Sequence, residues 1–240
     1  MPEDGSHQTF PQPKTAQKPN MKNIYLIRHA QSAANALPAH GGSVQFRNAE
    51  IPLTPLGEAQ AAALAQWLQE HAPPPDAIFV SPYLRTQQTA RPFLEKNGLK
   101  AAVLHDLHEF NYLAFDNVAG KKFMALNRLA EAYWQRGDAD YRDGADCDSF
   151  TTFYQRVMGI RAHFRTLPDG NYIAFSHGLW IGMLLWQLVG RSGNNMAHFR
   201  AFEQQVRPRN TETYLLRSDG QTESIAKVRS TREDDHAEAM

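Results

Sequence analysis

The chain has 240 residues, with 25 basic and 25 acidic side chains and therefore a formal net charge of zero. Such a balance lacks the basic surface of proteins that bind nucleic acid or anionic membranes. The single cysteine, Cys147, excludes an intrachain disulfide framework, and no stretch approaches the ~18 apolar residues of a transmembrane helix. We therefore expect a soluble, cytoplasmic protein that binds neither nucleic acid nor membrane, in which Cys147 is structural.

The length suits one domain with a substantial core. Residues 1–21 are polar and contain four prolines, so they bury too little apolar surface to offset the cost of ordering. They are predicted to form a disordered N-terminal arm. Residues 230–240 are rich in charged side chains and are predicted to be a frayed C-terminal tail. Residues 22–229 are then the folded domain.

The first predicted strand covers residues 24–27, a short apolar run of the kind that is buried on both faces of a sheet. It stops at Arg28 and His29. The next segment, residues 36–52, contains two adjacent glycines and no apolar periodicity. A connection of this length without its own secondary structure is a candidate lid or substrate loop.

Two helices are expected to begin with a hydroxyl cap followed by proline. Thr54 and Pro55 open a helix that is closed by the prolines at 73–75, and Ser81 and Pro82 open a helix that ends near residues 97–98. Between them, residues 76–80 form a second short apolar strand.

The remaining pattern alternates strands and helices. Residues 105–120 are expected to be irregular, and the strands and helices are expected at residues 101–104, 122–136, 149–167, 172–175, 179–189, 210–216 and 224–228. This order predicts an α/β fold, a three-layer sandwich with a mostly parallel central sheet, helices on both faces and antiparallel strands at the end of the chain.

Three apolar strands each end in a candidate phosphate ligand: Arg28 and His29, Ser81 with Arg85, and His177. Parallel strands bring their carboxyl ends to one edge of a sheet, where α/β proteins bind ligands. Guanidinium groups match the geometry of phosphate oxygens. Neighbouring positive charge would also keep His29 neutral and nucleophilic, and His177 could donate a proton to a phosphate oxygen.

Several segments together resemble the histidine phosphatase superfamily, the phosphoglycerate mutase-like group. In chain order they are residues 26–30 (LIRHA) with Asn35, residues 52–61 (PLTPLGEAQA), residues 81–90 (SPYLRTQQTA), residues 176–178 (SHG) and residues 209–212 (RNTE). The resemblance covers about residues 23–216 and implies a phosphoglycerate mutase-like fold.

The resemblance also implies roles for individual residues. His29 would become a phosphohistidine, and Glu109 would protonate the leaving oxygen and then activate water. The phosphate pocket would be formed by Arg28, Asn35, Arg85, His177 and Gly178. The implied reaction is the hydrolysis of a phosphomonoester without metal or cofactor.

Two departures from the family pattern bear on this interpretation. Mutases usually follow the acid with Arg-His-Tyr-Gly, whereas residues 110–113 here are Phe-Asn-Tyr-Leu. The loss of polar groups favours hydrolysis, with a mutase-type isomerase and a silent phospholigand-binding module as alternatives. Residues 146–149 (DCDS) replace a frequent Gly-Glu-Ser helix start, which affects capping more than chemistry.

Some alternatives remain at this stage. The proton donor could be His105, Asp106 or His108 instead of Glu109. Residues 105–109 could also suggest a metal site, but they lack the spacing of the zinc ligands in a zincin helix. Four aromatic residues could either line a substrate pocket or belong to the hydrophobic core: Phe46, Tyr112, Phe115 and Trp180. Selectivity is assigned to residues 36–52 and 111–144. A small phosphorylated substrate is expected, a sugar, nucleotide or cofactor precursor; a phosphoprotein is an alternative, and the sequence carries no marker of the oligomeric state.

Overall fold

The computed structural model describes residues 21–190 and 195–231. Its six strands form one sheet in the order β3-β2-β4-β1-β5-β6. The first four strands in this order run parallel to one another, whereas β5 is antiparallel to both of its neighbours, β1 and β6. The strands are β1 (Lys22–Arg28), β2 (Ala77–Val80), β3 (Ala102–Val103), β4 (Gly170–Ser176), β5 (Thr213–Ser218) and β6 (Glu223–Arg229).

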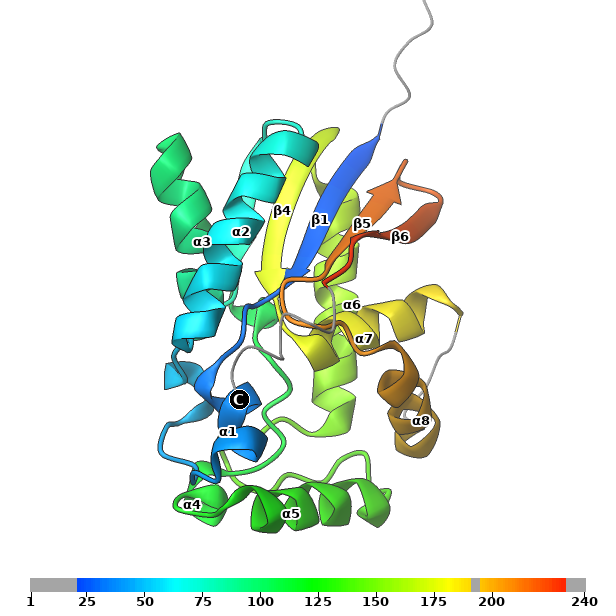
Figure 1. Cartoon of the computed structure of the whole chain (residues 1–240). Coiled ribbons are helices and arrows are strands. Elements are labelled where there is room, and N and C mark those ends of the chain that lie inside the picture. Colours follow the sequence, from blue (N-terminus) through cyan, green and yellow to red (C-terminus); the bar gives the residue numbers. More distant parts are fainter. Residues whose placement is uncertain (1–20, 191–194, 232–240) are drawn as a thin grey trace, which may run out of the picture.

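Helices cover both faces of this sheet (Figure 1). They are α1 (Ala33–His40), α2 (Pro55–His71), α3 (Leu84–Asn97), α4 (Phe115–Val118), α5 (Phe123–Arg136), α6 (Phe150–Thr166), α7 (Gly178–Leu188) and α8 (Met196–Val206), with two short 3₁₀ helices, η1 (Asn48–Glu50) and η2 (His105–Leu107). The predicted α/β sandwich with a mostly parallel sheet is confirmed.

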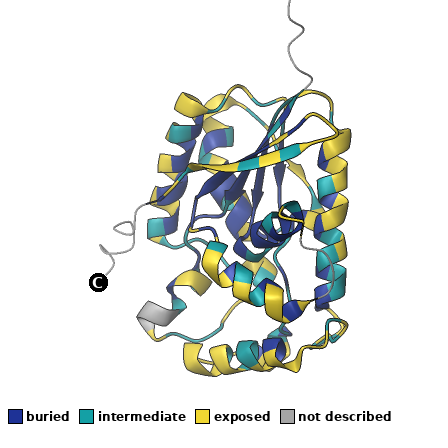
Figure 2. Ribbon diagram, turned by 90° about the vertical axis from the view of Figure 1, so that its right-hand side faces the viewer, coloured by how far each residue is buried: buried dark blue, intermediate teal, exposed yellow. Residues whose placement is uncertain are grey.

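The central strand shows how alternation along the chain builds two cores. Tyr25 and Ile27 of β1 pack with residues of α2 and α3, while Ile24 and Leu26 pack with residues of α6, α7 and α8. Successive side chains of a strand point to opposite faces, so one apolar run supplies both cores. The inner strands β1, β2, β4 and β5 are accordingly mostly buried, whereas the edge strands β3 and β6 and the outer sides of most helices are largely exposed (Figure 2).

One edge of the sheet gathers the chemistry. β1 and β4 run parallel, and their register places Arg28 opposite Ser176. The residues that follow these strands, His29 and His177, therefore leave the sheet at the same edge. In Figure 1 the arrows of β1 and β4 point toward α1, with α4 and α5 beyond it.

The helix starts were predicted only in part. Thr54 caps α2, since its hydroxyl accepts the amide of Gly57 at 3.0 Å, and Ser149 caps α6. The predicted cap at Ser81 is wrong, because α3 begins at Leu84. The Ser81 hydroxyl instead accepts the Tyr83 amide at 3.2 Å and lies 2.8 Å from a ring nitrogen of His177.

Three α-helices and two 3₁₀ helices appear where none was predicted. α1 and the 3₁₀ helix η1 lie in or beside the segment 36–52, the 3₁₀ helix η2 and α4 lie in the stretch expected to be irregular, and α8 precedes β5. The predicted arm and tail fall almost entirely on residues 1–20 and 232–240, outside the described residues, so the domain limits stay predictions. Within the described residues, no helix is long and apolar enough to cross a bilayer.

Candidate active site

His29 lies directly after β1 and is only 4% exposed. Its Nδ1 is 2.7 Å from the carbonyl oxygen of Ala30. A carbonyl only accepts, so Nδ1 must carry the hydrogen of the neutral ring. Nε2 then keeps its lone pair and accepts a hydrogen bond from Nε of Arg85 at 3.2 Å. The backbone thus selects the tautomer in which Nε2 is the nucleophilic atom.

The surroundings of His29 also keep its ring neutral. Burial, followed by the positive charges of Arg85 and Arg28, lowers the pKa of His29 well below its usual value of 6.5. Both effects disfavour the imidazolium. A lone pair is therefore available on Nε2 at neutral pH, as the sequence predicted from the neighbouring guanidinium.

Arg85 reaches the site from the first turn of α3 and is 4% exposed. Besides its bond to His29, it donates from Nη1 to the carbonyl of Asn48 at 2.6 Å and from Nη2 to Oδ1 of Asn48 at 3.1 Å. Burial lowers the pKa of Arg85 to about 10, so the guanidinium stays charged at neutral pH. Asn48 could not be predicted as a partner of Arg85, because no motif contains it.

Arg28, the last residue of β1, turns its guanidinium along the same edge. Nη1 donates to the carbonyl of Pro208, while the buried Nε has no hydrogen-bond partner within the part of the chain that the structure describes. A β-carbon on Gly178 would lie 3.3 Å from this Nε. Gly178 therefore leaves room for the guanidinium of Arg28. This role differs from the direct contact with phosphate that the family resemblance implied for Gly178.

Asn35, in the first turn of α1, lies beside His29 through a chain of hydrogen bonds. Its Oδ1 accepts from the backbone and side chain of Ser32 at 3.2 and 3.1 Å, and from Nδ2 of Asn210 at 3.1 Å. Nδ2 of Asn210 also donates to the carbonyl of His29 at 2.9 Å. With Oδ1 occupied, the amide hydrogens of Asn35 are the groups left to donate.

Glu109 is fixed by the start of α7. Its Oε1 accepts from the amides of Phe110 and Trp180 at 2.9 and 3.1 Å, and Oε2 accepts from the amide of Leu179 at 3.1 Å. First-turn amides have no partner within their own helix, so a carboxylate satisfies them well. Oε2 accepts one of these bonds and Oε1 two.

His177 lies behind His29, with the two ring centroids 5.2 Å apart, and is fully buried. The Ser81 hydroxyl accepts from the Tyr83 amide and lies within hydrogen-bond distance, 2.8 Å, of Nε2 of His177. Nδ1 of His177 is without a hydrogen-bond partner among the described residues. Burial, then the charge of Arg85, lowers the pKa of His177 well below 6.5.

These side chains surround a cavity of about 160 Å³. Of the predicted site residues, its walls include Arg28, His29, Asn35, Arg85, Glu109 and Gly178. His177 is not on the wall itself, and His105, Asp106 and His108 are not either. The rival proton donors are thus placed outside the cavity, whereas Glu109 is inside.

The walls of this cavity also include Arg207, which the sequence did not indicate. It follows α8 and donates from Nε to Oε1 of the fully buried Glu203. Although burial acts to lower it, the hydrogen bond and charge of Glu203 raise the pKa of Arg207. If α8 had been predicted from the sequence, Arg207 at its end could have been placed at the edge of the sheet that carries the site.

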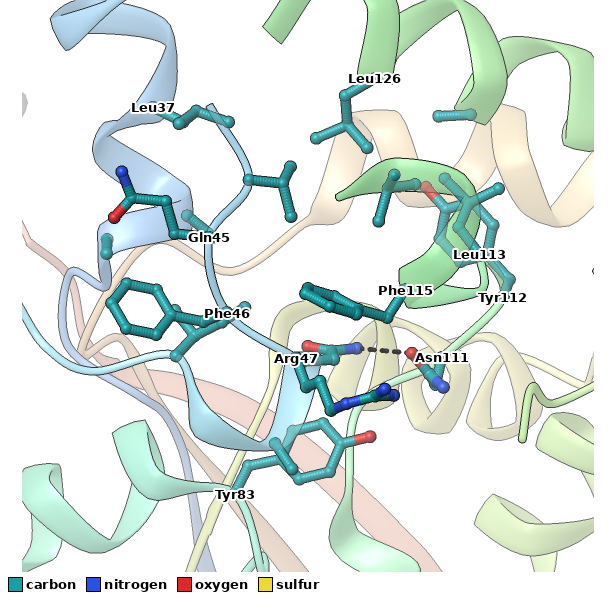
Figure 3. Close-up of a pocket in the computed structure, with 18 of the residues that line it drawn as sticks. Leu37, Gln45, Phe46, Arg47, Tyr83, Asn111, Tyr112, Leu113, Phe115 and Leu126 are labelled. Carbon is teal, nitrogen blue, oxygen red and sulfur yellow. Dashed lines mark hydrogen bonds between the residues drawn. The ribbon is translucent and has the colours of Figure 1, made fainter. Parts of the chain in front are cut away.

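A second, larger cavity of about 530 Å³ adjoins the first, between residues 33–51 and 110–130 (Figure 3). Three of the four candidate aromatic residues, Phe46, Tyr112 and Phe115, line it. Trp180 belongs to the core and donates from its indole nitrogen to the carbonyl of Asp106. Both segments to which selectivity was assigned therefore border one cavity.

One further reactive side chain is the thiol of Cys147. Cys147 is buried, and burial followed by the charge of Asp146 raises the pKa of its thiol to about 11. The thiol is therefore protonated at neutral pH. Within residues 21–190 and 195–231, no group of three His, Cys, Asp or Glu side chains is arranged to hold a metal ion.

Comparison with known proteins assigns the family. A sequence profile of the histidine phosphatase superfamily (branch 1) matches residues 24–231. The adenosylcobalamin/alpha-ribazole phosphatase of Escherichia coli is 26% identical over 178 residues, which are 74% of this chain and 84% of that protein.

Solved structures share the fold. The alpha-ribazole phosphatase of Shigella flexneri gives a TM-score of 0.68 at 21% identity, over 87% of this chain and 96% of that one. A phosphoserine phosphatase of Entamoeba histolytica, in complex with 3-phosphoglyceric acid, gives 0.66 at 20% identity, over 88% and 98%. Because the profile spans most of the sequence, the chain belongs to the histidine phosphatase superfamily (branch 1).

Proposed function

We propose that this protein is a metal-independent phosphomonoesterase in which a phosphoryl group is transferred first to His29 and then to water. The observation that carries the proposal is the state of the His29 ring. Its Nε2 has a lone pair, lies next to the guanidinium of Arg85 and borders a cavity that Arg28 and Glu109 also line. A nucleophile, cationic phosphate ligands and a proton carrier thus meet in one small space.

In the first step, Nε2 of His29 attacks the phosphorus in line with the leaving oxygen. A P–N bond forms, the P–O bond breaks, and the leaving oxygen keeps the electron pair and takes a proton from Glu109. Oε2 of Glu109, which accepts a single amide bond, is the oxygen suited to carry that proton. The released product is an alcohol.

In the second step, water attacks the phosphohistidine. Glu109, now a carboxylate, takes a proton from the water, the P–O bond forms and the P–N bond breaks. Inorganic phosphate leaves, and the proton on Glu109 is ready for the next cycle. The phosphoryl oxygens are stabilised by Arg28, Arg85 and the amide of Asn35, which line the cavity, while the ring of His177 packs behind His29.

The surroundings of Glu109 favour hydrolysis over the mutase alternative. Phe110 is 2% exposed and packs in the core, and the side chain of Asn111 is bound to Asn48 and to the carbonyl of Asp146. These positions offer no cation to retain a second phosphate or a carboxylate. Transfer of the phosphoryl group to water is therefore the outcome that the site supports best.

The relatives with named activities fit a small phosphorylated substrate, which we propose for this chain as well. A phosphoprotein fits less well, because one of its loops would have to enter a cavity of about 160 Å³. The cytoplasmic location remains a prediction from the sequence.

The test compares phosphate release from a panel of phosphate esters by the unaltered protein, His29→Ala and His71→Ala. Loss of the nucleophile lowers turnover by at least about 10³-fold. His71 lies on the exposed end of α2, so its substitution is expected to leave turnover unchanged. Equal release by His29→Ala would exclude the mechanism. Phosphate binding without release in the unaltered protein would instead support the silent binding module.

A further inference from the structure

The larger cavity adjoins the phosphate cavity. Ala34, Asn48 and Ile51 line both. An ester whose phosphorus lies at Nε2 of His29 therefore has this neighbouring cavity into which its alcohol portion can extend. This inference rests on the proposed function, because it concerns the leaving group of the same substrate.

The walls of the larger cavity are mainly apolar. Figure 3 shows side chains from both segments facing a common space, and the apolar contributors include Leu37, Val44, Phe46, Phe115, Leu126 and Ala130. Its volume of about 530 Å³ is in the range of cavities that hold a ligand of one or more rings. Apolar walls of this size recover binding free energy only from an apolar occupant.

The charges at this cavity are already paired. Among its described lining residues the ionisable carboxylate and guanidinium groups are Asp146 and Arg47, which lie 4.0 Å apart. Arg47 also lies 3.9 Å from Asp116 and over the ring of Phe115. A carboxylate or second phosphate on the leaving group would find no unpaired cation on these walls.

Hydrogen bonds join the two walls of the larger cavity, residues 33–51 and residues 110–130. The cavity therefore lies between segments that are held together and not between independent loops. The amide of Val44 donates to the carbonyl of Lys121 at 3.0 Å, and the amide of Gly120 donates back to the carbonyl of Val44 at 2.9 Å. At the other end, Nδ2 of Asn48 donates to Oδ1 of Asn111 at 3.1 Å. The same Asn48 binds Arg85, which ties the cavity to the phosphate site.

We propose that the natural substrate is the phosphate monoester of a bulky, uncharged, largely apolar alcohol, with an aromatic or fused-ring group seated between residues 33–51 and 110–130. The apolar portion lowers KM more than it changes the chemical step, because it contributes binding at a distance from phosphorus. Small carboxylated esters such as phosphoserine and 3-phosphoglycerate are correspondingly poor substrates.

The experiment uses esters with the same type of leaving oxygen: ethyl phosphate, 2-(1-naphthyl)ethyl phosphate, phosphoserine and 3-phosphoglycerate. We expect kcat/KM for the naphthyl ester to exceed that for ethyl phosphate by at least about tenfold, mainly through KM. A preference for either carboxylated ester, with turnover still dependent on His29, would overturn the substrate class and leave the phosphatase proposal intact.

A matched pair of variants on one helix locates the effect. Leu126 of α5 lines the cavity and is half-buried, whereas Met124 of the same helix is 63% exposed and does not line it. Leu126→Asp is expected to remove the preference for the naphthyl ester without changing kcat/KM for ethyl phosphate, and Met124→Asp to preserve it. Retention of the preference in Leu126→Asp would place the leaving group elsewhere.

A binding measurement keeps the two proposals separable. Calorimetric titration of 2-(1-naphthyl)ethylphosphonate and ethylphosphonate needs no turnover. Tighter binding of the naphthyl compound, lost in Leu126→Asp, supports the apolar leaving group even if no ester is hydrolysed. Equal affinity of the two phosphonates would contradict it.

Discussion

The phosphate cavity and the larger cavity beside it are built from different parts of the chain and offer different chemistry. The smaller one is lined by charged and polar groups delivered by strand ends and helix starts, such as His29 after β1 and Arg85 in α3. The larger one is lined by apolar side chains from a loop and an inserted helical segment. In our proposal the first cavity holds the phosphoryl group whose bond is broken, and the second selects the alcohol that is attached to it.

The two regions also differ in how their groups are held. In the phosphate cavity several side chains are held by distant parts of the chain, as when Asn210 bonds both Asn35 and the carbonyl of His29. The larger cavity depends on a few contacts between two segments, including the Asn48 to Asn111 bond. Substitutions in the first region should affect every ester alike, and those in the second should change the order of preference among esters.

The largest effect of this kind is expected for Arg85→Ala. Removing a guanidinium that contacts the nucleophile and would bind the phosphoryl oxygens lowers kcat/KM by about 10² to 10³-fold for every ester. Steady-state kinetics with ethyl and naphthylethyl phosphates measures it, and Arg91→Ala, an exposed arginine on the same helix, serves as the control. A loss confined to one ester would show that Arg85 acts on the leaving group.

Glu109→Gln is expected to lower turnover by about 10²-fold, because the amide can neither protonate the leaving oxygen nor deprotonate water. The binding of inorganic phosphate should persist. His108→Gln is the matched control, since His108 borders Glu109 in sequence but does not line the phosphate cavity. If His108→Gln and Glu109→Gln exchanged these outcomes, the proton carrier would be His108.

The two buried rings make stability depend on pH. The pKa values of His29 and His177 are lowered in the folded protein by burial and by nearby arginines, so the unfolded chain binds more protons below pH 6.5. Stability is therefore full above pH 6.5 and falls as the pH drops below it. Each ring contributes a slope of up to about 1.4 kcal/mol per pH unit.

Denaturant unfolding at pH 7.5 and 5.5 measures this slope. His177→Gln and His29→Gln should each reduce it, whereas His71→Gln, at an exposed position, should not. A stability that rose as the pH fell would mean that the rings are charged in the folded protein.

The smallest of these effects is expected at the junction of the two regions. Asn48→Ala removes one bond to Arg85 and the bond to Asn111, while its backbone carbonyl still accepts from Arg85. We expect kcat/KM to fall by about threefold to tenfold, more for the naphthyl ester than for ethyl phosphate. Equal losses for the two esters would show that Asn48 serves the phosphate cavity alone.

The same contrast explains what the sequence could predict. Apolar runs identify buried strands, and polar residues at their ends then converge by topology, which is why Arg28, His29, Arg85 and His177 could be named together. Asn35 and Glu109 came from the family pattern. The tautomer of His29 could not be predicted, because it depends on the distance from Nδ1 to a carbonyl.

The missed elements have physical reasons. α8 places Glu203 among its buried positions, with Met196 and Phe199, so its apolar period is interrupted by a charge that is neutralised only in the folded protein by Arg200 and Arg207. α1 contains a proline at position 38, a residue type that is unfavourable inside a helix. Ser81 followed by proline is a local pattern that predicts a cap, whereas its contact with His177 joins residues 96 positions apart, which no local pattern can indicate.

Direct detection of the covalent intermediate tests the central claim. The Glu109→Gln variant, which cannot deprotonate water, would be mixed with 4-nitrophenyl phosphate, an ester whose leaving oxygen needs no proton from Glu109. The reaction would be quenched in base and the peptides mapped by mass spectrometry. We predict an acid-labile phosphoryl group on His29 that is absent from the His29→Ala, Glu109→Gln double variant. Turnover without any such group, or with it on His177, would contradict the mechanism.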